Sequence, residues 1–301
     1  MRSRFAAVTS RLMDDHENIA VVLADISISH FAAAARRHPH RVVNVGIREQ
    51  AMIGAAAGMA LAGLRPIAHT YTPFLIERPF EQVKLDLGHQ ELGAILVSVG
   101  ASYDETGYGY THHAPGDVAL LDTLPGWTVH IPGHPDEVES FLRIAALNNN
   151  RVYIRLSAHT NDKPHARPDG QFTLLRSGSG ATVVAVGPML ERVLAATADL
   201  DVTVLYAPTV RPFDAATLRY VLAEPAVVLV EPYLRGTSAS KVSEALSDLP
   251  HRLLALGTPE HTARLYGSPS DHDIEYGLDV AGLRARISSF AARSDAPSAV
   301  R

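Results

Sequence analysis

The chain has 301 residues, of which 47% are hydrophobic, and a formal net charge of −5. This composition is typical of one large or two ordinary globular domains, and its mixed charge disfavours a nucleic-acid-binding surface. The absence of cysteine excludes disulfides, thiolate nucleophiles and cysteine-bound metals. We recognise no signal peptide and no apolar run of about 18 residues, so we expect a cytoplasmic protein without a membrane span.

The first part of the chain alternates short apolar segments with helical segments. Strands are predicted at residues 19–24, 42–45, 67–71, 94–99, 128–131 and 152–156. Helices are predicted at residues 27–37 with Ser27 as the cap, 48–62, 76–87 with a possible irregularity at Pro79, 118–124 and 136–147. A long Gly- and Tyr-rich loop, residues 100–113, is of the kind that is usually functional or mobile. The alternation predicts a mostly parallel, doubly wound sheet.

The second part repeats this pattern after a polar segment. Residues 158–171 are predicted to link a first domain, residues 1–157, to a second α/β domain, residues 172–292. Its strands are predicted at residues 182–186, 202–206, 226–230 and 252–256, and its helices at 190–198, 214–222, 238–246 and 280–290. An Asp- and Gly-rich loop precedes the last helix, and residues 293–301 are expected to be a disordered tail. The predicted fold class is therefore α/β, with two doubly wound domains.

The most informative segment is Gly46-Ile47-Arg48-Glu49-Gln50-Ala51-Met52, where a strand leads into a helix of small residues. Glu49 lies in the first turn of that helix, where the helix dipole stabilises a carboxylate. Taken alone, this position more often holds a solvated glutamate that stabilises the helix start. Its sequence context therefore decides how Glu49 is interpreted.

Three segments, in this order and spacing, resemble the transketolase family of thiamine-diphosphate enzymes: the segment around Glu49, the segment Phe74 to Val83, and Gly109-Tyr110-Thr111-His112-His113. The second domain is similar to the family's C-terminal domain, with Gly187-Pro188 after its first strand and Val230-Glu231-Pro232 after its third. The resemblance covers nearly the whole chain. It corresponds to the C-terminal two-thirds of a full transketolase, which is the small subunit of split, two-component transketolases.

This resemblance implies a cofactor site for thiamine diphosphate. Glu49 matches the glutamate that hydrogen-bonds the aminopyrimidine ring and so helps the cofactor lose its reactive proton. Phe74 and Phe80 match aromatic residues that pack on that ring, although two phenylalanines alone are more commonly core residues. The family's third aromatic is missing from residues 76–78. Asp25 matches an aspartate near the cofactor, but an aspartate at a strand end is often only a cap.

The resemblance also implies substrate-binding residues in the long loop. His112 matches a histidine that contacts the substrate near its reacting carbonyl, where an imidazole can donate to a developing alkoxide. His113 stands in place of the family's glutamine, and Tyr108 in place of an acidic residue. We therefore expect His112 to be catalytic and His113 and Tyr108 to lie near the substrate. Two adjacent histidines are, by themselves, only a weak signal of metal binding.

Most of the family's phosphate-binding side chains are absent. Gly100 replaces a histidine, Ala158 replaces an arginine, and only Arg2 is a candidate for the remaining phosphate-contacting arginine. Phosphate recognition normally uses several such donors. We therefore expect transfer of a two-carbon ketol unit from a ketose to an aldose-type acceptor that is not phosphorylated or is held differently, such as a specialised-metabolite sugar.

The family's diphosphate and magnesium motif, Gly-Asp-Gly with a downstream Asn, is also missing; Gly116-Asp117-Val118 is not a match. No metal is expected in this chain. The resemblance implies that Mg²⁺ is held by a large partner subunit, with thiamine diphosphate bound across the interface of a symmetric α₂β₂ assembly. The small-residue helix is the candidate interface.

Two other interpretations remain open. The β subunit of a 2-oxoacid dehydrogenase, or a deoxyxylulose-phosphate-synthase relative, shares the glutamate and the fold. The Gly-Ile-Arg-Glu-Gln context and the six-residue spacing of Phe74 and Phe80 favour transketolase. The other interpretation, from a different class, is a non-catalytic regulatory partner subunit, and the presence of Glu49, Phe74 and His112 argues against it.

Overall fold

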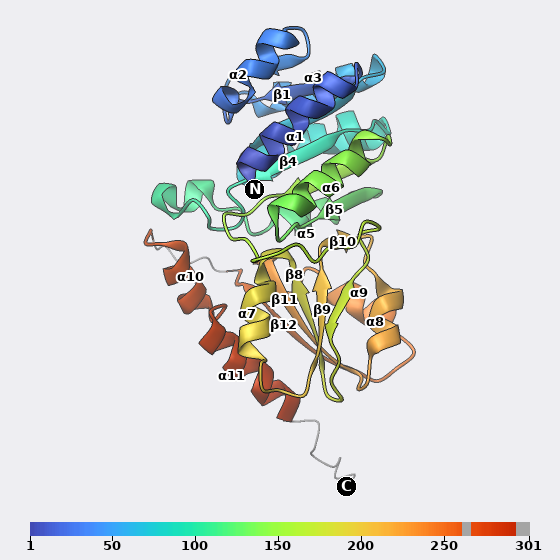
Figure 1. The fold of residues 1–301 in the computed structure, drawn as a ribbon, viewed down its shortest axis with the longest axis vertical. Coiled ribbons are helices and arrows are strands. Elements are labelled where there is room, and N and C mark those ends of the chain that lie inside the picture. The colour runs from blue at the N-terminus through green and yellow to red at the C-terminus, as the bar shows by residue number, and fades with distance from the viewer. Residues whose placement is uncertain (261–265, 293–301) are drawn as a thin grey trace.

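The computed structural model describes residues 1–260 and 266–292, which form two α/β units one above the other in Figure 1. In each unit, helices cover both faces of one sheet. No helix among the described residues has the length and apolar character needed to cross a bilayer.

The upper unit contains a seven-stranded sheet in the order β10-β5-β6-β4-β3-β1-β2 (Figure 1). Its neighbouring strands pair in parallel except β10 with β5. The strands are β1 (Ile19–Leu23), β2 (Val42–Asn44), β3 (Arg65–Tyr71), β4 (Ile95–Val99), β5 (Trp127–His130), β6 (Arg151–Arg155) and β10 (Thr209–Arg211). Parallel strands buried on both faces explain the continuous apolar runs of the sequence.

Two groups of helices cover this sheet. One face packs against α1 (Arg2–Asp15), α2 (Ile28–Arg37) and α6 (Pro135–Ala146). The other packs against α3 (Glu49–Leu61), α5 (Asp117–Leu121) and a broken helical segment. That segment comprises the π-helix η1 (Pro73–Glu77), the short α4 (Phe80–Gln82) and the π-helix η2 (Val83–His89). The long loop contains the 3₁₀ segment η3 (Thr106–His112).

The lower unit contains a five-stranded sheet in the order β12-β11-β8-β9-β7, parallel except for β7. Its strands are β7 (Thr173–Arg176), β8 (Thr182–Val186), β9 (Thr203–Ala207), β11 (Ala226–Leu234) and β12 (Arg252–Thr258). Its helices are η4 (Gly187–Met189), α7 (Leu190–Ala196), α8 (Ala215–Val221), α9 (Ala239–Ala245), α10 (Pro269–Tyr276) and α11 (Val280–Ala291). The predicted fold class, two doubly wound α/β units with mostly parallel sheets, is confirmed.

Several local features differ from the sequence prediction. Helix α1 and strands β7 and β10 were not predicted, and the expected loop before residue 280 contains α10, which Ser268 begins with a capping box. Strand β10 follows the predicted linker, yet it pairs with β5 and completes the first sheet. The expected irregularity at Pro79 is present as a break between η1 and α4. Residues 293–301, predicted to be a disordered tail, lie outside the described residues.

The prediction that the Ser27 side chain caps α2 is wrong. Ser27 precedes α2, but its side chain makes no capping hydrogen bond, and its backbone has a φ of 66°. Its hydroxyl instead contacts Arg2 and His69. This contact takes the place of the cap, and the left-handed backbone aims the Ser27 hydroxyl inward.

Candidate functional site

The predicted site residues follow the carboxyl ends of strands β1 to β4, at the left of the upper unit in Figure 1. Ligands of doubly wound sheets bind at this edge, where the connecting loops converge. Backbone strain is concentrated here too, since the non-glycine residues Asp25, Ser27 and Ser102 all have positive φ. Such conformations are held in place by the surrounding structure and gather at functional sites.

Glu49 begins α3 and is 1% exposed. The turn before it includes Gly46 with a φ of +69°, a conformation that glycine adopts without penalty. The Glu49 carboxylate is paired with Arg78, whose Nη1 lies 2.7 Å from its Oε2. The Arg78 side chain is 37% exposed, so a buried acid is neutralised by a base that reaches in from the surface.

The same guanidinium lies on the ring of Phe74, with its Cζ 4.0 Å from the ring centroid. A flat group that carries N–H donors therefore sits between the Phe74 face and the Glu49 carboxylate. An aminopyrimidine ring requires the same two contacts, one aromatic face and one carboxylate beside a ring nitrogen. Arg78 shows that a flat group with N–H donors can contact Glu49 and Phe74 together.

His112 also contacts Phe74 edge to face, with ring centroids 5.0 Å apart. It also contacts Tyr71 edge-on at 5.6 Å and stacks on Tyr108 at 4.5 Å. Burial lowers the pKa of His112; the Glu105 charge partly opposes that shift and the Arg78 charge adds to it. The imidazole is thus neutral at neutral pH, and it can donate an N–H to a developing negative charge.

The other candidates occupy different surroundings. Asp25 is exposed and accepts a 3.0 Å hydrogen bond from the Asn44 side chain, which is a strand-end contact. Phe80 begins α4, and no ring contact joins it to Phe74 among the described residues. His113 is buried against His272 of α10, with ring centroids 5.4 Å apart. The structure therefore brings Glu49, Phe74 and His112 together, with Tyr108 at their edge.

Sequence reasoning missed Arg78 and Tyr71. Arg78 stands where the family's third aromatic is expected, and a cation that stacks on a neighbouring ring is one signal that could have identified it. Tyr71 ends β3 and had no motif to mark it. Both become visible only when β3, the break at Pro79 and the long loop are placed together.

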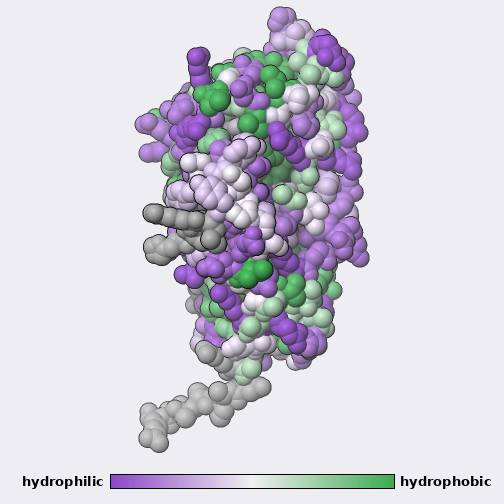
Figure 2. Space-filling view, turned by 90° about the vertical axis from the view of Figure 1, so that its left-hand side faces the viewer, coloured by the Kyte–Doolittle hydropathy of each residue, from purple (hydrophilic) through white to green (hydrophobic). Residues whose placement is uncertain are grey.

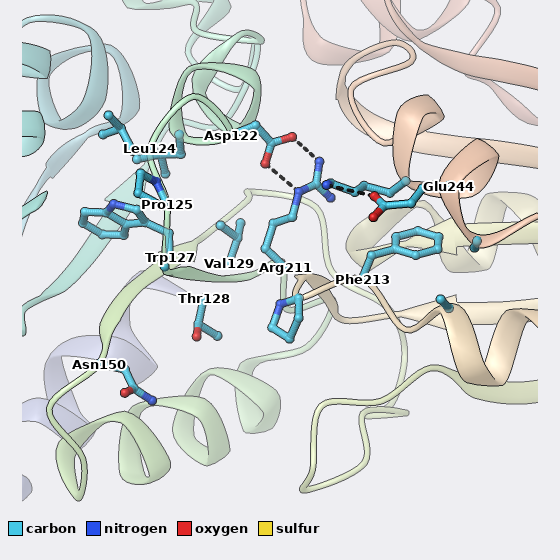
Figure 3. Close-up of a pocket in the computed structure, with 16 residues that line it drawn as sticks. Asp122, Leu124, Pro125, Trp127, Thr128, Val129, Asn150, Arg211, Phe213 and Glu244 are labelled. Carbon is cyan, nitrogen blue, oxygen red and sulfur yellow. Dashed lines mark hydrogen bonds and ion pairs between the residues drawn. The ribbon is translucent and has the colours of Figure 1, made fainter. Parts of the chain in front are cut away.

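A cavity away from these residues is shown in Figure 3. It has a volume of about 780 Å³ between β5 and α9. Its main charged groups are paired with one another, Arg211 with Asp122 and Lys241 with Glu244. None of the predicted site residues lines it, so its size alone does not make it the functional site.

Comparisons with known proteins agree with this fold. The family model described as "Transketolase, pyrimidine binding domain" matches residues 1–161. The model described as "Transketolase, C-terminal domain" matches residues 170–283. The solved structure described as "Split gene transketolase, inactive beta4 tetramer" superposes with a TM-score of 0.82 at 27% identity, and the match covers 97% of each chain.

Three relatives illustrate the range of similar proteins. An "Uncharacterized 33.6 kDa protein in fasciation locus" of Rhodococcoides fascians is 49% identical over 96% of this chain and 94% of its own length. An apulose-4-phosphate transketolase subunit of Actinobacillus succinogenes is 30% identical over 88% of this chain and 89% of its own. "1-deoxy-D-xylulose-5-phosphate synthase 2" of Geobacter sulfurreducens is 31% identical over 96% of this chain but only 49% of its own.

Proposed function

This chain belongs to the transketolase family, and we propose that it is the small, pyrimidine-binding subunit of a two-component transketolase. It transfers a two-carbon ketol unit between a ketose donor and an aldose-type acceptor, with thiamine diphosphate as cofactor. The observation that carries the proposal is the Glu49–Arg78–Phe74 arrangement. In it, a buried carboxylate and an aromatic face both contact one flat group.

The residues have separable tasks in this proposal. Glu49 holds a shared proton at a nitrogen of the aminopyrimidine ring, and Phe74 fixes the plane of that ring by stacking. His112, held against Phe74 and Tyr71, donates its N–H to the substrate oxygen that becomes negative. When bound, thiamine diphosphate supplies the electron sink that carbon–carbon bond formation and cleavage require. Arg78 must leave the Glu49–Phe74 site before the cofactor ring can enter it.

A partner chain is part of the proposal, and helix α3 supports it. Met52 and Ile53 face the core, yet Leu61 is 66% exposed and the outward side carries further apolar and small residues, including Ala51 and Gly58. A helix that is apolar all round is normally covered by protein. Figure 2, which faces the left of Figure 1, shows apolar surface among polar residues in the upper part of the molecule.

We propose that this partner is the large subunit with the diphosphate-binding domain, in an α₂β₂ assembly. Among the described residues, no group of three or more His, Asp or Glu side chains is placed to bind a metal ion. In the proposal the partner holds Mg²⁺ and the diphosphate, while this chain supplies the pyrimidine site. The relative from Actinobacillus succinogenes, itself named as a subunit, has nearly the same length, since the match covers 89% of it.

The test is co-expression with the product of a neighbouring gene that carries the Gly-Asp-Gly motif. We expect ketol transfer that requires both chains, Mg²⁺ and thiamine diphosphate. If the mixed chains form a complex but transfer no ketol unit from any of a panel of ketoses, the proposal is wrong, and a non-catalytic partner role is then the better interpretation.

A second candidate, a deoxyxylulose-phosphate-synthase-like activity, is favoured by the 31% identity to the Geobacter protein. Identity alone does not separate it from the transketolase relative, which is 30% identical. This chain spans about half of the synthase. Pyruvate consumption by the complex, measured beside ketose consumption, distinguishes the two activities.

A further inference from the structure

A smaller cavity of about 160 Å³ adjoins the His112 site. It lies at the carboxyl ends of the neighbouring strands β4 and β6, where the start of α1 reaches the sheet (Figure 1). Gly100, Glu105 and Ala158 line it, together with Arg2. Tyr71 links the two places, because its ring contacts His112 and lies beside Gly100.

Gly100 determines the wall of this cavity. It has a φ of +69°, and a Cβ placed on it would lie 2.7 Å from Tyr71 Cδ1 and 3.0 Å from Glu105 Cγ. Any side chain at residue 100 would therefore clash with the Tyr71 ring or displace Glu105. The space that a basic side chain could fill is instead bounded by an aromatic ring and a carboxylate.

The two acidic residues of the cavity are not equivalent. Asp104 accepts hydrogen bonds from the backbone N–H groups of Ala101 at 3.1 Å and Ala158 at 2.8 Å. Its carboxylate therefore joins the segment after β4 to the segment after β6. Within the ranges 1–260 and 266–292, the Glu105 carboxylate makes no hydrogen bond or ion pair, although its charge acts on His112. Glu105 thus remains available to a ligand in the cavity.

Arg2 is a cation in the lining of this cavity, and a buried chain of hydrogen bonds positions it. His69 Nδ1 lies 2.7 Å from the Val97 carbonyl, which can only accept, so Nδ1 carries the proton. His69 Nε2 then accepts from the Ser27 hydroxyl at 2.7 Å, and that hydroxyl accepts from Arg2 Nε at 2.7 Å. Arg2 is held in this way on the wall that it shares with Glu105.

We infer that this cavity receives the far end of the acceptor substrate, and that Glu105 beside Arg2 selects an uncharged, hydroxylated end over a phosphorylated one. The inference rests on the proposed ketol transfer. A sugar hydroxyl donates to the carboxylate, and its neighbour accepts from the guanidinium, which satisfies both charges. A phosphate dianion is instead repelled by the unpaired carboxylate, and one arginine does not supply the several donors that phosphate sites use.

The test compares two acceptors of one carbon skeleton, D-glyceraldehyde and D-glyceraldehyde 3-phosphate, on the assembled complex. We expect the wild-type complex to have the higher kcat/KM for the free aldehyde. Glu105→Gln keeps the size and removes the charge, and it should shift the ratio of the two kcat/KM values toward the phosphorylated acceptor by about tenfold. Arg2→Gln should lower kcat/KM for both acceptors.

Glu17→Gln is the matched control. Glu17 is exposed just before β1, at the opposite edge of the sheet, and the same charge change there should leave the ratio unchanged. A wild-type preference for the phosphorylated acceptor, or a Glu105→Gln ratio equal to that of wild type, overturns the inference while ketol transfer stands. A complex that transfers no ketol unit to any acceptor refutes the proposed function, and the inference with it.

Discussion

Glu49 and Glu231 are both almost fully buried, one in each α/β unit, and the protein holds them differently. Glu49 is 1% exposed, and its described partner is the half-exposed side chain of Arg78. Glu231 in β11 is fully buried and accepts backbone N–H groups of Gly236 at 2.8 Å and Ser238 at 3.0 Å. Backbone N–H groups hold the Glu231 carboxylate as part of the fold. The Glu49 carboxylate is instead paired with a surface side chain, which a ligand can replace.

The largest expected effect tests the Glu49 half of this comparison. Glu49→Gln keeps the shape but no longer shares a proton with the cofactor ring, so kcat should fall by about 10³-fold, within the usual range for acid–base groups. The free energy of unfolding should change by no more than about 1 kcal/mol, because the lost ion pair is partly solvated. Steady-state kinetics of the complex and urea unfolding of the chain measure the two quantities. Retained activity would contradict the assigned role.

Glu231→Ala should give the opposite result. It leaves the N–H groups of Gly236 and Ser238 without acceptors in the interior, which should lower the free energy of unfolding by about 2–4 kcal/mol at pH 6. Activity per folded complex should remain near that of wild type. A large loss of kcat at unchanged stability would place Glu231 in the catalytic machinery and end the contrast with Glu49.

The pH dependence of stability sharpens the same point. Burial raises the pKa of Glu231 to about 7, although hydrogen bonds from Ser238 and Gly236 oppose the shift. Because the folded pKa lies above the unfolded one, the stabilisation is complete below about pH 4.5 and is lost as the pH rises through 7. Relative to Glu231→Gln, wild type should lose about 3 kcal/mol over this interval. Parallel curves for the two proteins would show that Glu231 does not titrate there.

The smallest effect concerns Arg78. Arg78→Met removes the guanidinium that contacts both Glu49 and Phe74. The complex should then bind thiamine diphosphate about fivefold more tightly, because a partly exposed ion pair and a cation–π contact are each of modest strength. Lys84→Met, an exposed cation in η2, is the control and should leave the affinity unchanged. Weaker binding by the Arg78 variant would mean that Arg78 holds the cofactor and does not compete with it.

The sequence predicted most strands of the two sheets but not the details of the site. Continuous apolar runs such as Ile19–Leu23 mark buried parallel strands, and the Glu49 context located the start of α3. Strand β10 has only three residues and pairs with β5, which is distant in sequence, so no local sequence pattern predicts it. The cap expected of Ser27 was lost because tertiary partners, Arg2 and His69, took its hydroxyl.

Side-chain placement explains the remaining differences in the site. His112 and His113 are adjacent in sequence, but at the end of η3 the His112 ring contacts Phe74 and the His113 ring contacts His272. The break at Pro79 and the π-helical turns around it bring Arg78 back over Phe74. Neither outcome has a periodic signature, because both depend on where irregular segments meet.

Whether this chain supplies half of the cofactor site can be tested by calorimetric titration of thiamine diphosphate, in Mg²⁺ buffer, into this chain, into the large subunit and into their equimolar mixture. If Glu49 and Phe74 form half of a shared site, only the mixture should bind the cofactor tightly, at one molecule per pair of chains. The Glu49→Gln mixture should bind it more weakly. Tight binding to this chain alone, or equally tight binding to the large subunit alone, would contradict the account.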